Sequence, residues 1–173
     1  MRSLSFLLLL LAIACGNKTT DPQAAAGEAK AVAVSGGPFL TMKVDGKEVV
    51  CTDIFGAYNP KGYPKGTAIV AGEMRPDKSQ PFNIALYDVQ NTGSYTINNQ
   101  SDPIKWAVQY VNPESTDPFN IRLLAVNSKD GESFTIRFTK LSDFDLEGTF
   151  EGTLTSDNGQ TVVRITEGKF DTQ

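Results

Sequence analysis

Apolar and polar residues alternate along most of the chain from residue 39 onward. Leu40, Met42 and Val44 form one apolar face of the first such segment, because side chains two residues apart point the same way in a β-strand. Two later segments have apolar faces of the same kind, formed by Phe134, Ile136 and Phe138 and by Leu146, Phe150 and Leu154. No window of eleven residues after position 39 has a helical period. We therefore expect a single all-β domain over residues 38–173.

Turn sequences that contain glycine separate these segments. Asp45-Gly46 joins two alternating segments directly, and both residues can adopt the positive φ that a two-residue β-hairpin requires. Asn91-Thr92-Gly93, Asp130-Gly131 and Asn158-Gly159 occupy similar positions. With about nine or ten strands, the pattern predicts an antiparallel meander that forms a β-sandwich or a flattened barrel.

The last segment, "TVVRITEGKF", changes phase. Val163 and Ile165 share a face, but Phe170 lies an odd number of residues further on. Glu167-Gly168 stands between them, and an extra residue in one strand is what a β-bulge supplies. We expect a bulge there that returns Phe170 to the core.

An internal repeat links two parts of the chain. Residues 75–97 and 112–136 share the pattern Pro-Phe-Asn-Ile-x-Leu-x-x-Val, followed by a glycine turn and Ser-(Tyr/Phe)-Thr-Ile. We interpret this as an internally duplicated three-stranded unit, although convergence between two meanders is the alternative. Residues 81–97 and 118–136 should then form equivalent strand pairs, with Asn83 and Asn120 pointing away from the core.

The N-terminus has the outline of a secretory signal. Arg2 supplies one positive charge and residues 4–14 are almost all apolar. The apolar run is shorter than the ~20 residues that a membrane span needs. Ala12-Ile13-Ala14 fits the A-x-A pattern of ordinary signal cleavage, which would give a plain secreted protein in which Cys15 and Cys51 are free to pair.

The segment Leu11-Ala12-Ile13-Ala14-Cys15 also resembles a bacterial lipobox, although Ala12 departs from the usual leucine. The resemblance implies that residues 1–14 are a lipoprotein signal peptide and that Cys15 is lipidated. We prefer this interpretation because the leader is short and residues 15–37 have the polar, small composition of a flexible tether. Gly16 follows the cysteine, which by resemblance to envelope sorting favours the outer membrane.

Charge and composition exclude several function classes. The chain has 16 basic and 20 acidic residues, a net charge of −4, and no histidine. A mildly acidic chain is a poor binder of nucleic acid and of anionic lipid headgroups. Without histidine there is no Ser/His or Cys/His catalytic pair and no usual zinc site. We expect no enzymatic activity, no cofactor and no metal.

The best site candidate is the irregular segment "IFGAYNPKGYPKG", residues 54–66. Phe55, Tyr58 and Tyr63 stand among glycines and prolines there. Exposed aromatic side chains on a loop can stack on sugars or contact a protein partner. The alternative is that the three fold back and close one end of the sheet pair.

Other residues of interest favour structural roles. Asp143, Asp145 and Glu147 should share a strand face as a solvated edge rather than a calcium site. Cys51 should be a small buried hydrophobe. Trp106, which shares a face with Val108, should pack in the core.

Both ends of the domain resemble a family of small, uncharacterised lipoproteins of Bacteroidota-type bacteria. The opening match is "VDGK", residues 44–47, and the closing match lies in "LEGTFEGTLTSDNGQTVVRITEGKFD". The matched closing positions are Gly148, Phe150, Gly152, Val163, Ile165, Thr166, Gly168 and Phe170. The resemblance implies fold and location but no activity, because its motifs are those of turns and strands.

The sequence therefore predicts a non-enzymatic cell-envelope lipoprotein. Its lipid anchor would hold it on a membrane, and its β-domain would bind a partner protein or a glycan. The alternative is a structural subunit of an envelope complex with no ligand of its own.

Overall fold

The computed structural model describes residues 37–51, 53–74, 79–112, 115–117 and 121–173. The predicted signal peptide, Cys15 and the predicted tether up to residue 36 lie outside these residues, so those assignments stay predictions. The β domain belongs to a compact unit, Val34–Gln173. Within the described ranges, no helix is both long enough and apolar enough to cross a membrane.

The described part of the domain contains eleven strands and one short 3-10 helix. They are β1 (Phe39–Val44), β2 (Lys47–Cys51), β3 (Asp53–Tyr58), β4 (Ala68–Met74), β5 (Ser79–Leu86), β6 (Gly93–Ile97), β7 (Trp106–Val111), β8 (Arg122–Leu124), η1 (Ala125–Asn127), β9 (Phe134–Ser142), β10 (Asp145–Ser156) and β11 (Val162–Asp171). The all-β prediction is confirmed, and eleven strands replace the nine or ten expected.

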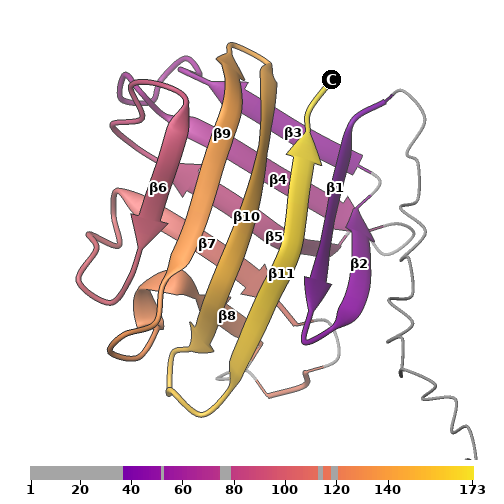
Figure 1. Ribbon diagram of the computed structural model, residues 1–173, viewed down its shortest axis with the longest axis vertical. Helices are drawn as coiled ribbons and strands as arrows, with labels where there is room; N and C mark the ends of the chain where they lie inside the picture. The colour runs from indigo at the N-terminus through magenta and orange to yellow at the C-terminus, as the bar shows by residue number, and fades with distance from the viewer. Residues whose placement is uncertain (1–36, 52, 75–78, 113–114, 118–120) are drawn as a thin grey trace, which may run out of the picture. The chain divides into compact units, whose positions relative to one another are not determined.

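The strands form one antiparallel sheet folded into two layers (Figure 1). The front layer has the order β6-β9-β10-β11-β1-β2, and the back layer has the order β8-β7-β5-β4-β3. β10 joins the layers, because most of it pairs with β9 while Thr155 and Ser156 pair with β8. Strands of the two layers cross at a steep angle in Figure 1, as in orthogonally packed sheets. The predicted sandwich or flattened barrel is thus confirmed.

Apolar side chains from both layers fill the space between them. The rings of Phe82 from the back layer and Phe150 from the front layer stack with centroids 4.6 Å apart. Phe138 and Phe170 meet edge to face at 5.7 Å. The three apolar faces predicted from alternation are all buried: Leu40, Met42, Val44, Phe134, Ile136, Phe138, Leu146, Phe150 and Leu154. Together with the buried apolar residues of the back layer, these faces supply the hydrophobic contribution to stability.

Two predicted local features are present. Asp45 and Gly46 have φ of 48° and 81° and connect β1 to β2, as a two-residue hairpin requires. The bulge at Glu167-Gly168 is also present, because Thr41 pairs with Lys169 while Lys43 pairs with Thr166. Phe170 is buried as a result.

The strand pairing predicted for the internal repeat is wrong. β5 pairs with β4 and β7 in the back layer, whereas β6 pairs with β9 in the front layer. Each repeat segment therefore crosses between layers instead of forming a meander, and the turns at Asn91-Thr92-Gly93 and Asp130-Gly131 do not join paired strands.

The two repeat segments also differ from each other. Within their described residues, only the second contains a 3-10 helix, and Ile84 is fully buried whereas its counterpart Ile121 is 36% exposed. Asn83 lies between the buried Phe82 and Ile84, on the opposite face of the strand, as expected. Asn120 lies outside the described residues.

Candidate binding site

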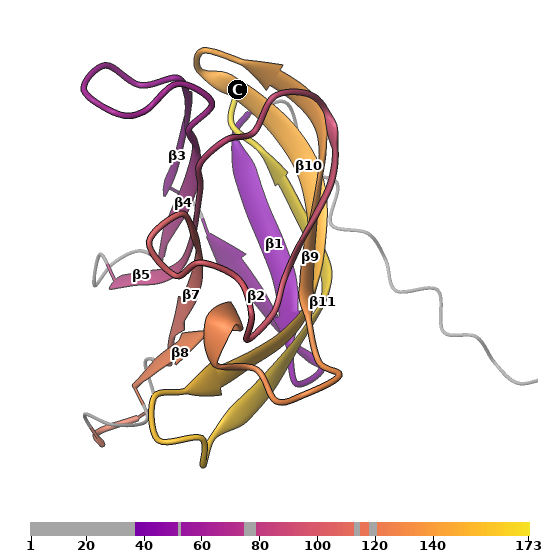
Figure 2. The same ribbon diagram turned by 90° about the vertical axis from the view of Figure 1, so that its left-hand side faces the viewer.

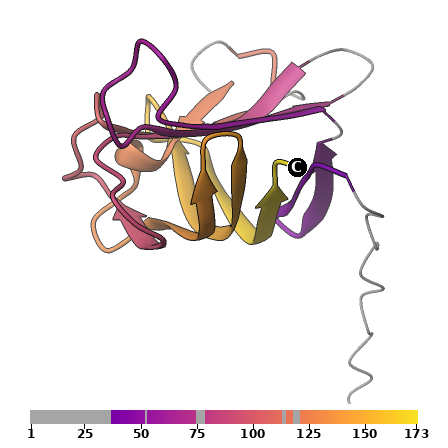
Figure 3. The ribbon, with the colours of Figure 1, turned by 90° about the horizontal axis from the view of Figure 1, so that it is seen from above.

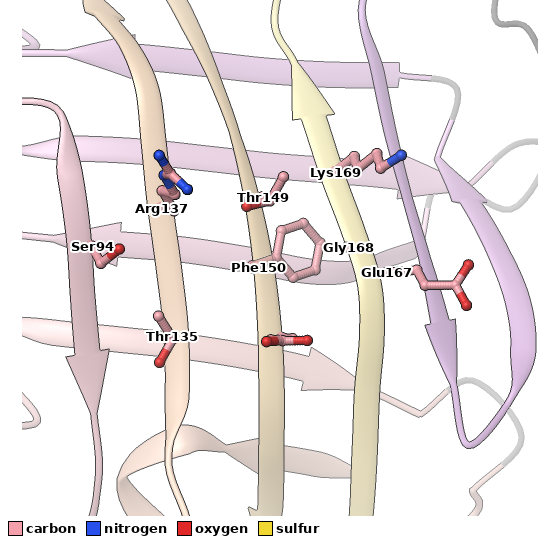
Figure 4. A pocket seen from close by; sticks show the side chains of 9 residues that line it. Ser94, Thr135, Arg137, Thr149, Phe150, Glu167, Gly168 and Lys169 are labelled. Atoms are coloured by element: carbon pink, nitrogen blue, oxygen red, sulfur yellow. The ribbon is translucent and has the colours of Figure 1, made fainter.

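A shallow depression of about 370 Å³ lies on the outer face of the front layer (Figure 4). Its walls come from β6, β9, β10 and β11, which are neighbours in the sheet but distant in sequence. The lining residues are Ser94, Thr135, Arg137, Thr149, Phe150, Glu151, Glu167, Gly168 and Lys169. Its volume falls within the range of small-ligand sites, although its lining is more polar than most.

The register of the strands places the two cations of the depression in one row. Ser94 pairs with Arg137, Arg137 pairs with Thr149, and Thr149 pairs with Lys169. Neighbouring strands are about 4.8 Å apart, so the backbones of Arg137 and Lys169 are separated by roughly 10 Å. The Thr149 hydroxyl stands between them, and all these side chains are exposed.

The next row carries the carboxylates. Thr135 pairs with Glu151, and the bulge brings Glu167 onto the same surface with a left-handed φ of 54°. Lys43 Nζ lies 2.7 Å from Glu167 Oε1, so this carboxylate is balanced by its own cation. One face therefore offers cations in one row and a carboxylate with a threonine hydroxyl in the next.

Gly168 and Phe150 lie in contact at the base of the depression. A Cβ on Gly168 would come within 2.5 Å of Phe150 Cε2, and Figure 4 shows the Phe150 ring beside Gly168. Because Gly168 has no side chain, the Phe150 ring can occupy the space beside β11. Gly168 thus allows the bulge and the buried aromatic stack to occupy neighbouring positions.

The cations of the depression are available to a ligand. Among the described residues, the side chains of Arg137, Lys169 and Glu151 have no hydrogen-bonding or ion-pair partner in the chain. Counting Lys43, the depression holds three positive and two negative side chains, a net charge of +1, on a chain whose own net charge is −4. Arginine and lysine bind carboxylate, sulfate or phosphate groups, and Glu151 can accept hydrogen bonds from ligand hydroxyls.

The predicted acidic face is not assembled. Asp143 lies in the turn between β9 and β10, Asp145 is buried and ion-paired with Lys140, and Glu147 is exposed. This ion pair holds the Asp145 carboxylate against Lys140 of the neighbouring strand β9. The hydrogen bond that Lys140 donates to Asp145 raises the pKa of Lys140. In the part of the chain that the structure describes, no group of three or more His, Cys, Asp or Glu residues could hold a metal ion.

The predicted aromatic loop is divided by the structure. Phe55 belongs to β3 rather than to a loop and is 55% exposed, whereas Tyr58 packs against the core from the same strand. The Tyr58 hydroxyl donates to the Val89 carbonyl oxygen at 2.8 Å. Tyr63 lies in the β3–β4 loop and is 52% exposed. The three side chains therefore do not form one stacking surface, and only Tyr58 follows the alternative of folding inward.

Cys51 and Trp106 occupy the structural positions expected of them. Cys51 is fully buried, and burial raises the pKa of its thiol to about 11. Such a thiol is not a nucleophile at neutral pH. Trp106 is half-buried and meets the ring of Tyr95 edge to face, with centroids 6.0 Å apart.

No family model, no curated protein and no solved structure matches the chain. The resemblance to small Bacteroidota-type lipoproteins therefore stays a prediction, and the site rests on its geometry. Sequence reasoning missed Arg137, Thr149 and Lys169. Strand alternation places each of them on an outer face, but only the order of the strands brings them together.

Proposed function

We propose that this chain is a lipid-anchored, non-enzymatic protein of the bacterial cell envelope whose β domain binds an acidic saccharide. The observation that supports this proposal is the pairing of Arg137 and Lys169 across Thr149 in one depression, without partners in the described chain. A sugar acid carries a carboxylate for the cations and several hydroxyls for Thr135, Ser94 and Glu151. A purely anionic ligand would be repelled by the Glu151 carboxylate.

The proposed location rests on the sequence around Cys15. A diacylated Cys15 would hold the protein on a membrane, because each buried methylene contributes about 0.8 kcal/mol. Gly16 favours the outer membrane. The mature chain would then carry 15 basic and 20 acidic residues, since Arg2 is removed with the leader.

The experiment titrates the mature chain with an oligomer of galacturonic acid and measures the affinity by calorimetry. Arg137→Ala and Lys169→Ala should each weaken binding about 10- to 100-fold, as expected for loss of a hydrogen bond to a charged group. Arg164→Ala is the matched control, because Arg164 is exposed on β11 outside the depression, and it should leave the affinity within about twofold.

Two further ligands sharpen this titration. The neutral galactose oligomer of equal length should bind much more weakly than the acidic one. A short polyglutamate peptide should also bind weakly, because it lacks the hydroxyls that Glu151 and Thr135 would contact. Equal affinity for the peptide, or unchanged affinity in both alanine variants, would refute the saccharide proposal.

One observation favours the alternative of a structural subunit. The outer face of the back layer carries an uncharged row of partly exposed residues, Ile69, Ala85 and Ala107, beside a second uncharged row, Phe55, Ala71, Asn83 and Gln109, whereas Ala57 at the end of the first row is buried. An uncharged sheet face of this kind suits packing against another sheet. If the protein is such a subunit, Ala85→Arg should release it from a larger complex on a native gel while saccharide binding stays unchanged.

A further inference from the structure

One end of the domain combines several features that the proposed saccharide site does not use. We name as the loop end the β3–β4 loop (residues 59–67), the β9–β10 turn (Asp143-Phe144), the beginning of β1 and the end of β11. Figure 2 shows the loop and the turn at the same end of the two layers, and Figure 3 looks onto that end. The Tyr58 N–H donates to the Asp143 carbonyl oxygen at 2.8 Å, which connects the loop of the back layer to the turn of the front layer.

Two aromatic side chains of the loop end are exposed to solvent. Phe144 is 69% exposed at the tip of the turn and Tyr63 is 52% exposed at the tip of the loop. Lys61 and Lys65 flank Tyr63 and are exposed as well. Aromatic side chains next to lysines are typical of protein surfaces that lie at the boundary between lipid headgroups and acyl chains.

Hydrogen bonds hold the β3–β4 loop in one conformation. Asn59 anchors it, because its N–H donates to the Thr67 carbonyl oxygen at 2.8 Å and its Oδ1 accepts from the Gly66 N–H at 2.6 Å. Thr67 Oγ1 donates to the Pro64 carbonyl oxygen at 2.6 Å. The Val89 N–H donates to the Gly66 carbonyl oxygen. A loop fixed in this way can present Tyr63 without losing further conformational freedom on binding.

The first strand of the domain begins at this same end. Phe39 pairs with Asp171, and Thr172 Oγ1 donates to the Phe144 carbonyl oxygen at 3.1 Å. Twenty-two residues separate Cys15 from Pro38 in the sequence. If these residues form the flexible tether that their composition predicts, their root-mean-square span is about 26 Å. A lipid on Cys15 would therefore keep the loop end at a high effective concentration next to the bilayer.

The tips of the loop end are cationic, in contrast to the acidic chain as a whole, which the net charge made a poor partner for anionic headgroups. The two tips contain two exposed lysines, Lys61 and Lys65, and one exposed acid, Asp143. The next acid along the chain, Asp145, is paired with Lys140. Asp171 ends β11 and is a further acid of the loop end outside the two tips, whereas Glu147 lies further along β10. The tips therefore carry a net charge of +1, two lysines against one aspartate.

We infer that the loop end docks on the anionic surface of the bilayer that holds the lipid anchor. Tyr63 and Phe144 enter the headgroup boundary, and Lys61 and Lys65 contact headgroup phosphates. This inference rests on the proposed lipidation of Cys15. The diacylated cysteine would hold the chain on the bilayer, and contacts of the loop end with headgroups would fix the orientation of the domain. Docking at this end leaves the saccharide depression on the side of the domain, open to ligands.

The test uses variants of the full lipidated chain, each with one introduced cysteine, in vesicles of phosphatidylethanolamine and phosphatidylglycerol. Phe144→Cys and Tyr63→Cys are labelled with an environment-sensitive fluorophore, and Gln160→Cys in the β10–β11 hairpin is the matched control at the other end of β10. Only the introduced thiol reacts, because Cys51 is buried and Cys15 carries the lipid. The labels at positions 144 and 63 should shift to the blue and be quenched by lipid-borne quenchers, whereas the label at position 160 should not.

Water-like emission at all three positions would overturn the docking inference. In the double variant Lys61→Glu, Lys65→Glu, the blue shift at position 144 should fall by at least half in these vesicles, and an undiminished shift would contradict the role of the lysines. The mass of the N-terminal peptide separates the two proposals. A chain without lipid on Cys15 would refute the anchor, whereas a lipidated chain with water-like labels would refute docking alone.

Discussion

Thr172, the second-last residue, lies directly against Gly56 of the opposite layer. A Cβ on Gly56 would come within 2.6 Å of Thr172 Cβ. Thr172 Oγ1 also accepts from the Leu146 N–H at 2.9 Å and donates to the Phe144 carbonyl oxygen. One threonine therefore connects β3, the β9–β10 turn and the end of β11, and it does so only because position 56 has no side chain.

Gly56→Ala should accordingly destabilise the domain. Moving Thr172 away would cost about 1–3 kcal/mol, the usual range for overpacking. The measurement is the midpoint of thermal or urea unfolding. Gly37→Ala is the matched control, because a Cβ there meets nothing within 4 Å. Equal midpoints for the two variants would show that Thr172 is not packed as described.

Thr155→Val should stabilise the protein. Thr155 Oγ1 is buried and has no hydrogen-bond partner within the described residues, and an unsatisfied buried hydroxyl costs about 1–3 kcal/mol. Valine has nearly the same shape and removes the hydroxyl. The urea midpoint should rise for this variant but stay unchanged for Thr139→Val, which is exposed on β9. A lower midpoint for Thr155→Val would mean that the hydroxyl is satisfied after all.

Cys51 should make stability depend on alkaline pH. Its pKa is raised from 9.0 to about 11 in the folded state, so between those values the unfolded chain releases a proton that the folded chain retains. Its contribution is therefore fully present below pH 9 and falls as pH rises toward 11, by roughly 1.4 kcal/mol per pH unit. Unfolding curves at several pH values should show this slope in a Cys15→Ala chain. The slope should shrink in Cys15→Ala, Cys51→Ala, and an identical slope would contradict the assignment.

The three aromatics of the predicted binding loop should respond differently to truncation. Phe55→Ala and Tyr63→Ala remove exposed side chains and should change the free energy of unfolding by within about 0.5 kcal/mol. Tyr58→Ala removes core packing and the hydrogen bond to Val89, and should cost about 2 kcal/mol or more. Thermal melting of the three single variants checks this ranking. Equal losses would show that the three residues form one cluster.

Local features of the fold could be predicted from the sequence because they depend on neighbours along the chain. Alternation predicted the buried faces of β9 and β10, Asp45-Gly46 predicted a hairpin, and the phase change before Phe170 predicted the bulge. The repeat could not reveal that β5 and β6 lie in different layers. Crossing between layers depends on which distant strands compete for pairing, and the shared Pro-Phe-Asn-Ile motif carries no information on that.

The candidate site was beyond sequence reasoning for a related reason. Arg137 and Lys169 lie on strands separated by β10, and their register to Thr149 is fixed by the β9–β10 turn and the bulge at Glu167. A shift of one residue in either strand would send one cation to the core face. Phe55 illustrates the reverse case, because the glycines and prolines of residues 54–66 suggested a loop, whereas Phe55 lies in β3 and its strand position determines its exposure.

The mass of the mature N-terminus tests the account most directly, because both the proposed location and the docking of the loop end depend on it. The protein purified from the membrane fraction should begin at Cys15, and its first peptide should carry the mass of a diacylglycerol group. Cys15→Ala should abolish this modification and either prevent cleavage or release the chain from the membrane. A native chain that begins at another residue, or at Cys15 without lipid, would contradict the assignment of this protein to the membrane-anchored envelope proteins.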